Sequence, residues 1–165
     1  MARLKPISDA AVPAALEKAL RYRLLNEPLE AESICLDVLE IDPDNQEATV
    51  SLLLAITDQF GEEMGDGVRR AREVLPRITD EYERTYYAGI ICERRARAQL
   101  HRGSLGSAEV ASEGFREAMG WYEKAEPMRP KGNDEAILRW NTCARMLGRH
   151  ERVYVPGEYE PALDD

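Results

Sequence analysis

The sequence predicts an all-α fold of about three helical hairpins followed by a single C-terminal helix. Apolar residues of the stretch 31–45 recur at helical spacing until Pro43 ends that helix. The same spacing recurs between Ala118 and Pro130. Ala, Glu, Arg and Leu dominate the composition, with 32% charged and 7% aromatic residues, which is typical of long helices.

Length and charge narrow the possible classes of protein. A chain of 165 residues is long enough for one domain, and its net charge of −9 disfavours a nucleic-acid role. The sequence contains no apolar run of 18 residues, so we expect no membrane helix. The first residues lack the apolar centre of a signal peptide, and we therefore expect a cytoplasmic protein.

The hydrophobic pattern and the breaker residues divide the chain into consecutive parts. These are a lead-in (1–8), a helical domain (9–148) with hairpins at about 12–45, 46–81 and 82–132 and a capping helix at 133–147, and an acidic flexible tail (149–165).

The first hairpin follows from its prolines. Pro13 lies near the start of a helix that reaches about Leu25, and Pro28 begins a partner helix that ends near Ile41. In the second hairpin, Asn45 precedes a strongly apolar helix that Gly61 is expected to end. Its partner helix is expected to run from residues 64–66 to about residue 78.

The third hairpin is expected to be longer than the first. Asp80 caps a helix that continues to about His101, a Gly- and Ser-rich breaker follows at 102–107, and the return helix reaches Ala125. A last helix, 134–147, is capped by Asn133. It has no partner helix after it and is expected to cover the open edge of the core.

Two units of the chain carry the spacing of the tetratricopeptide repeat, W-x2-L-G-x2-Y…A-x3-F…P, whose period is about 34 residues. In the first unit Ala15, Lys18, Ala19 and Cys35 replace the Trp, the Leu, the Gly and the aromatic residue of that pattern. The positions of both units that we expect to pack helices together are Ala19, Tyr22, Ala31, Pro43, Gly89, Ala118, Tyr122, Ala125 and Pro130.

From residue 12 to residue 147 the chain therefore resembles a tetratricopeptide-repeat (TPR) protein, of the small bacterial type. The resemblance implies a right-handed superhelix of hairpins whose concave face holds a peptide or protein segment. In such a stack the first helix of each hairpin lines the concave face.

Matching the turns of these first helices gives three rows of candidate binding residues. The first row is Leu16, Val50 and Tyr86, the second is Leu20, Leu54 and Ile90, and the third is Arg23, Asp58 and Arg94, with Ile137, Asn141 and Arg145 continuing them on the last helix. These rows predict an apolar floor with a charged end, suited to a segment with bulky apolar side chains. The alternative interpretation is that some of these residues belong to the core.

TPR domains that grip a C-terminal carboxylate use Lys and Asn in the groove, where this chain has Leu16 and Leu20. The resemblance does not extend to that class of ligand.

No motif of catalysis, phosphate binding or metal binding occurs in the sequence, so we expect no enzyme activity, no cofactor and no metal. The three cysteines, Cys35, Cys92 and Cys143, occupy apolar stripes. They are interpreted as small buried hydrophobic residues in a reducing compartment.

The function expected from these observations is a protein-interaction module, an adaptor or scaffold whose partner is a protein, a peptide or a second copy of the chain. One alternative is a nucleic-acid-associated accessory protein that uses the basic stretch 93–97 with His101, Arg102 and Arg116. The interpretation without a functional role is that this stretch is a solvated helix face in which Glu93 pairs with Arg97. A second alternative, by analogy of fold, is a secretion-type chaperone.

Overall fold

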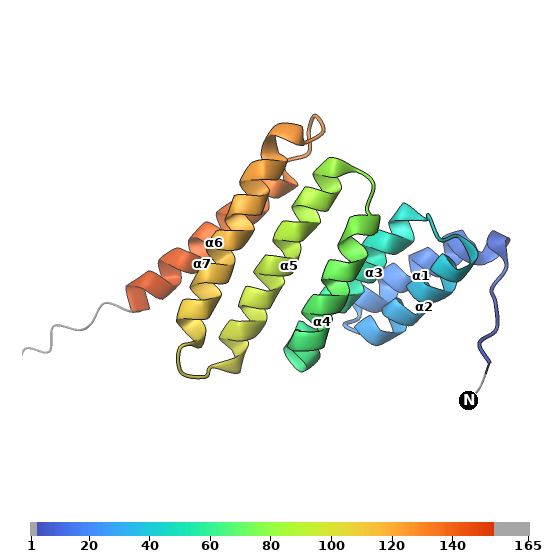
Figure 1. Cartoon of the computed structure of the whole chain (residues 1–165), viewed down its shortest axis with the longest axis horizontal. Helices are drawn as coiled ribbons and strands as arrows, with labels where there is room; N and C mark the ends of the chain where they lie inside the picture. Colours follow the sequence, from blue (N-terminus) through green and yellow to red (C-terminus); the bar gives the residue numbers. More distant parts are fainter. Residues whose placement is uncertain (1–2, 154–165) are drawn as a thin grey trace, which may run out of the picture.

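The computed structural model describes residues 3–153, in which an irregular lead-in at 3–8 is followed by helices and the short connections between them (Figure 1). The α-helices are α1 (Val12–Leu24), α2 (Pro28–Ile41), α3 (Gln46–Asp58), α4 (Phe60–Val74), α5 (Glu81–Arg102), α6 (Ser107–Ala125) and α7 (Glu135–Val153). Short 3-10 turns precede α1 (Asp9–Ala11) and follow α4 (Leu75–Arg77) and α6 (Glu126–Met128). The all-α class and the seven helices expected from the sequence are confirmed for residues 3–153.

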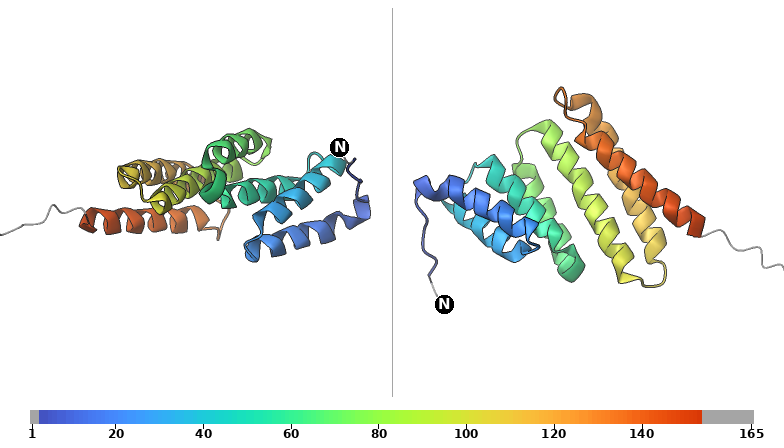
Figure 2. Two further views of the ribbon diagram at one scale, coloured as in Figure 1. Left: turned by 90° about the horizontal axis from the view of Figure 1, so that it is seen from below. Right: turned by 180° about the vertical axis from the view of Figure 1, so that it is seen from behind.

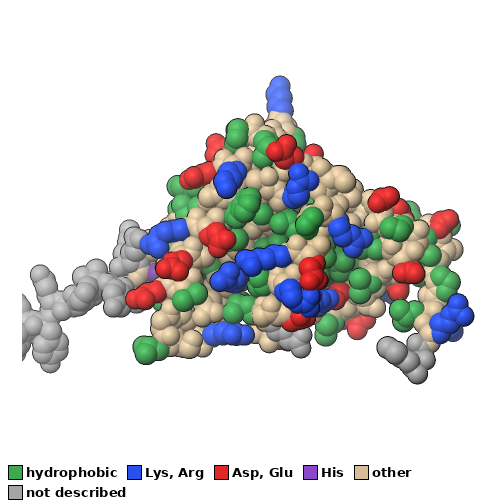
Figure 3. Space-filling model, in the orientation of Figure 1, with side chains coloured by type: hydrophobic (Ala, Val, Ile, Leu, Met, Phe, Trp, Pro, Cys, Tyr) green, Lys and Arg blue, Asp and Glu red, His purple; other side chains and the backbone are tan. Residues whose placement is uncertain are grey.

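Each helix packs against its neighbours in sequence, so α1/α2, α3/α4 and α5/α6 form hairpins and α7 packs on α6. Helices α1 and α7 project to the same side of the molecule, with α3 and α5 between them (Figure 2). We call the surface made by α1, α3, α5 and α7 the inner face. The opposite surface, the outer face, carries positive and negative side chains interspersed with hydrophobic ones (Figure 3).

The junction between α3 and α4 differs from the sequence prediction. Gly61 does not end the first helix of this hairpin; α3 ends at Asp58 and α4 begins at Phe60, with only Gln59 between them. The Gln59 amide donates to the Ala55 carbonyl oxygen at 3.0 Å and to Glu32 Oε2 at 2.6 Å, which fixes the break. Helix α4 therefore begins at Phe60, whose side chain is buried in the core.

The last helix is also longer than predicted. It extends to Val153, so residues 149–153, which were assigned to the flexible tail, are helical. Asn133 caps it as predicted, because Asn133 Oδ1 accepts a hydrogen bond from the Glu135 N–H at 3.0 Å. Residues 1 and 2 of the predicted lead-in and residues 154–165 of the predicted tail lie outside the described residues.

The third hairpin is long, as expected, with 22 residues in α5 and 19 in α6. Its two helices approach closely at Gly89, where an added Cβ would lie 2.5 Å from Cε1 of the buried Tyr122 ring. The other residues expected to pack helices fall into three groups: Ala19, Ala31, Ala118 and Ala125 are fully buried, Tyr22 is half-buried, and Pro43 and Pro130 are exposed in turns.

Two hydrophobic clusters share α5. The first joins α1–α4 and includes Ile91 and Ala98 from one side of α5. The second joins the other side of α5, around Ile90, to α6 and α7. Leu54 and Tyr87 pack against both clusters, so they connect the two halves of the molecule.

Candidate functional site

The third predicted row meets on the inner face. Arg23 of α1 donates from Nε to Asp58 Oδ2 at 2.8 Å, and Arg94 of α5 pairs with the other oxygen of the same carboxylate. The matching of helical turns was therefore right for these three residues. One aspartate of α3 thus joins two arginines that are 71 positions apart in the sequence.

Arg94 also binds groups other than Asp58. Its Nη1 donates to Thr57 Oγ1 at 2.9 Å. Burial lowers the pKa of the Arg94 guanidinium, and the nearby positive charges of Arg23 and Arg139 lower it further. The side chain therefore lies where solvent stabilises its charge less than at an exposed position.

A second charged group centres on Glu93, whose side chain is 1% exposed. Its carboxylate accepts from Tyr122 Oη at 2.8 Å, from Arg97 Nε at 3.0 Å and from Arg139 Nη1 at 3.3 Å. The predicted pairing of Glu93 with Arg97 is confirmed, but the predicted solvated helix face is wrong, because Glu93 is buried and Arg97 is half-buried. These three donors satisfy the hydrogen-bonding capacity of the carboxylate. A buried carboxylate needs such partners, because its charge has lost its contact with water.

Arg139 was missed because the predicted row on the last helix passes through Ile137, Asn141 and Arg145. In the structure the half-buried Arg139 reaches α5, Asn141 is half-buried, and Arg145 is exposed. Helix α7 is thus rotated relative to a simple continuation of the earlier turns. No signal in the sequence fixes that rotation, since α7 has no return helix to repeat the spacing.

The two apolar rows do not form a continuous exposed strip, and that prediction is wrong. Leu16, Tyr86 and Ile90 are buried in the clusters, Val50 and Leu54 are half-buried, and only Leu20 is exposed. The reason is geometric. Each first helix is wedged between its own partner and the next hairpin, so residues one turn apart on the predicted rows are enclosed by packing.

Exposed leucines instead flank the inner face. Leu20 on α1 is 50% exposed and Leu138 on α7 is 62% exposed. Leu24, one turn beyond Leu20, is also exposed. A hollow of about 340 Å³ is lined by residues of α3–α5 that include Asp58 and Arg94, and a second hollow of about 260 Å³ is lined by residues of α5 and α7 that include Leu138 and Arg139.

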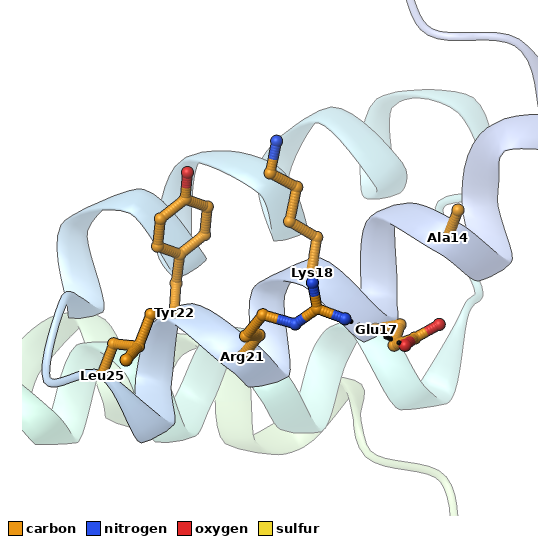
Figure 4. A pocket seen from close by; sticks show the side chains of 6 residues that line it. All are labelled: Ala14, Glu17, Lys18, Arg21, Tyr22 and Leu25. Carbon is orange, nitrogen blue, oxygen red and sulfur yellow. Dashed lines mark hydrogen bonds and ion pairs between the residues drawn. The ribbon is translucent and has the colours of Figure 1, made fainter.

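A further hollow of about 510 Å³ lies on the N-terminal edge of the molecule (Figure 4). Its lining residues come from α1 and from the residue that follows it: Ala14, Glu17, Lys18, Arg21, Tyr22 and Leu25. Glu17 and Arg21 pair with each other at 3.2 Å, and both are exposed. This hollow is an open helix surface, and no second helix contributes a polar group that would orient a ligand.

The three cysteines are buried and free, as predicted. Burial raises the pKa of Cys35 to about 11 and those of Cys92 and Cys143 to about 12, so the thiols are poor nucleophiles near neutral pH. Among the described residues no group of three His, Cys, Asp or Glu side chains could hold a metal ion. Within residues 3–153, no helix combines the length and the apolar character needed to span a bilayer.

Comparison of the chain with protein-family models, with curated proteins and with solved structures found no match. Its function is therefore inferred from the inner face itself.

Proposed function

We propose that this chain is a TPR-like protein-interaction module, cytoplasmic as the sequence predicts, which binds a segment of a partner protein on its inner face. Its role is binding and not catalysis, and it uses no cofactor. The succession of hairpins supports this proposal, as do the fully buried alanines and the close approach of Gly89 to Tyr122 at the positions that the repeat spacing assigns to helix contacts.

The observation that carries the proposal is the pair of exposed leucine flanks on either side of partly buried arginines. Leu20 and Leu24 of α1 and Leu138 of α7 are exposed, whereas the residues between them are mostly enclosed. Apolar side chains beside a hollow with a few polar groups are typical of binding sites. Full burial of one leucine stabilises a complex by about 1.5–3 kcal/mol relative to its exposure.

The nucleic-acid hypothesis is less well supported than protein binding. No residue of the basic stretch 93–97 is exposed, since Glu93 and Ala96 are buried and the arginines are half-buried. The stretch therefore presents no open row of arginines to a phosphate backbone. The secretion-chaperone hypothesis and a second copy of the chain use the same surface, so the experiment below also bears on them.

The experiment is a selection of binding peptides from a random display library on the wild-type protein, followed by a comparison of variants. Leu20→Glu combined with Leu138→Glu places a charge on each flank without touching a buried side chain. Leu105→Glu is the matched control, because Leu105 is fully exposed in the turn between α5 and α6. Helicity and melting temperature of each variant are measured alongside binding.

Selected peptides should lose binding to the double variant and keep it for the control, with the fold of both variants unchanged. Peptides that bind both proteins equally would place the binding surface elsewhere on the molecule. A selection that enriches no peptide, together with a concentration-dependent dimer that the double variant abolishes, would make a second copy of the chain the partner.

A further inference from the structure

We infer that the segment bound on the inner face is acidic, with its carboxylates paired to the guanidinium groups of Arg23, Arg94 and Arg139. This inference rests on the proposed function and names the chemistry of the partner. The recognition differs from capture of a C-terminal carboxylate, because none of these arginines stands at the positions of Leu16 and Leu20, and the acceptors are carboxylates of side chains.

The first support is the balance of charge. Asp58 is shared by Arg23 and Arg94, and Glu93 is shared by Arg97 and Arg139. Four guanidinium groups thus surround two carboxylates, an excess of two positive charges in a chain whose net charge is −9. Glu135 lines the hollow beside Arg139, and Glu27, Glu30 and Glu62 line a separate hollow that Asp58 also lines, so the excess of positive charge is that of the four arginines and their two paired carboxylates alone.

The second support is the supply of hydrogen-bond donors. Within residues 3–153, Arg23 bonds Asp58 through Nε, and Arg94 bonds its partners through Nη1. A guanidinium carries five N–H donors, so other nitrogens of both side chains can meet a further acceptor. The side chains of the four arginines are between 16% and 37% exposed, so a ligand can reach them.

The third support is the environment of these charges. Burial lowers the pKa of Arg94, and the like charges of Arg23 and Arg139 add to that effect. A carboxylate brought between these groups relieves like-charge repulsion in a place that water screens poorly. The positions of Arg23 and Arg94 are already fixed by Asp58, so little side-chain entropy is lost when the ligand binds.

The shape of the surface favours a polypeptide over a nucleic acid. Leu20 and Leu138 flank the arginines, and they suit apolar side chains between the acidic ones of a bound segment. Bases would need exposed aromatic rings to stack on, whereas Tyr82, Tyr86 and Tyr122 are buried. A nucleic acid is nevertheless included in the test as a competitor.

The test uses two fluorescein-labelled peptides of twelve residues, which differ only in that four glutamates of the first are glutamines in the second; both carry the same leucines. Binding to the full chain is followed by fluorescence anisotropy. We expect the glutamate peptide to bind at least about tenfold more tightly at low salt, since charge-assisted hydrogen bonds are roughly twice as strong as neutral ones. Added salt should shrink that difference.

Arg23→Gln should weaken binding of the glutamate peptide about tenfold and leave the glutamine peptide nearly unaffected, because one charge-assisted contact is lost. Arg23→Lys should recover part of that loss. Arg21→Gln is the matched control, since Arg21 lies on the same helix but is exposed and pairs with Glu17 at the N-terminal edge. Asp58 keeps Arg94 as a partner in the Arg23 variants, so the fold should persist.

Equal binding of the two peptides, or equal effects of Arg23→Gln and Arg21→Gln, would overturn the acidic ligand. So would a failure of both peptides to bind, or displacement of the glutamate peptide by a single-stranded oligonucleotide at comparable concentration. The proposed function is judged separately by the leucine-flank variants. If those abolish binding of selected peptides that carry no excess of acidic residues, the inner face binds proteins and only the acidic chemistry is wrong.

Discussion

Replacement of Gly89 by alanine tests the tightest contact between α5 and α6. The new Cβ would lie 2.5, 2.8 and 3.0 Å from Cε1, Cδ1 and Cζ of Tyr122, whereas carbon atoms pack best at about 3.5–4.0 Å. The ring cannot swing aside, because it is buried and its hydroxyl donates to Glu93. Overpacking of this kind costs about 1–3 kcal/mol. Alanine in a helix interior recovers about 0.8–1 kcal/mol relative to glycine.

Gly120→Ala is the matched control for this change. Gly120 lies inside α6, and nothing approaches the place of its Cβ within 4 Å. The gain in helix propensity is common to both variants, so their difference in free energy of unfolding isolates the clash at about 1–3 kcal/mol. For a domain of this size that corresponds to a melting temperature lower by roughly 2–12 °C for Gly89→Ala than for Gly120→Ala.

Chemical and thermal denaturation of both variants gives the result directly. If Gly89→Ala is as stable as Gly120→Ala, then Tyr122 does not lie across Gly89, and the pairing of α5 with α6 has to be revised. A double-mutant cycle with Tyr122→Leu provides a second check. Removal of the ring should eliminate most of the penalty of Gly89→Ala, because the two residues are in direct contact.

Three further predictions concern the buried groups. Glu93→Gln should lower the free energy of unfolding by about 1–3 kcal/mol in urea denaturation, against at most about 1 kcal/mol for the exposed Glu17→Gln, since only the first change weakens a buried network. The thiol pKa values are raised in the folded state, so their contribution to stability is intact below pH about 9 and should be lost as pH rises towards about 11–12. Denaturation midpoints should therefore decrease across that pH range. The decrease should be smaller for a variant in which Cys35, Cys92 and Cys143 are all replaced by alanine. Ala118→Leu should lower the melting temperature, because Ala118 is fully buried, and Ala108→Leu, at an exposed position of the same helix, should leave it nearly unchanged.

Helix periodicity predicts most of this fold because the boundaries carry local signals. Asn45 and Asp80 accept hydrogen bonds from backbone N–H groups three residues later, as their positions before apolar stripes indicate. The break at Gln59 has no such local signal. It depends on the contact of Gln59 with Glu32, which lies 27 residues earlier, and the glycine at 61 suggested the wrong position.

The sequence predicted the part of the candidate site in which equivalent turns of consecutive hairpins share the repeat spacing. It did not predict the rest of the site. Arg23, Asp58 and Arg94 meet because equivalent turns of consecutive hairpins stand side by side. Exposure could not be predicted in the same way, because burial of Leu16 or Ile90 depends on how deeply each helix is wedged into the stack. The contribution of Arg139 to the site could not be predicted for a related reason, since the rotation of α7 about its axis is set by packing on α6.

The division of the hydrophobic interior at α5 has a consequence for cooperativity. Arg94 connects α5, which lies at that division, to Asp58 of α3, and Leu54 and Tyr87 pack against both clusters. A segment bound along the inner face would lie across the same boundary and add contacts on each side of it. A bound segment should therefore bring the hydrogen-exchange rates of backbone amides in α1–α4 and in α6–α7 closer together. The two units, which can unfold separately in the free protein, would then unfold together.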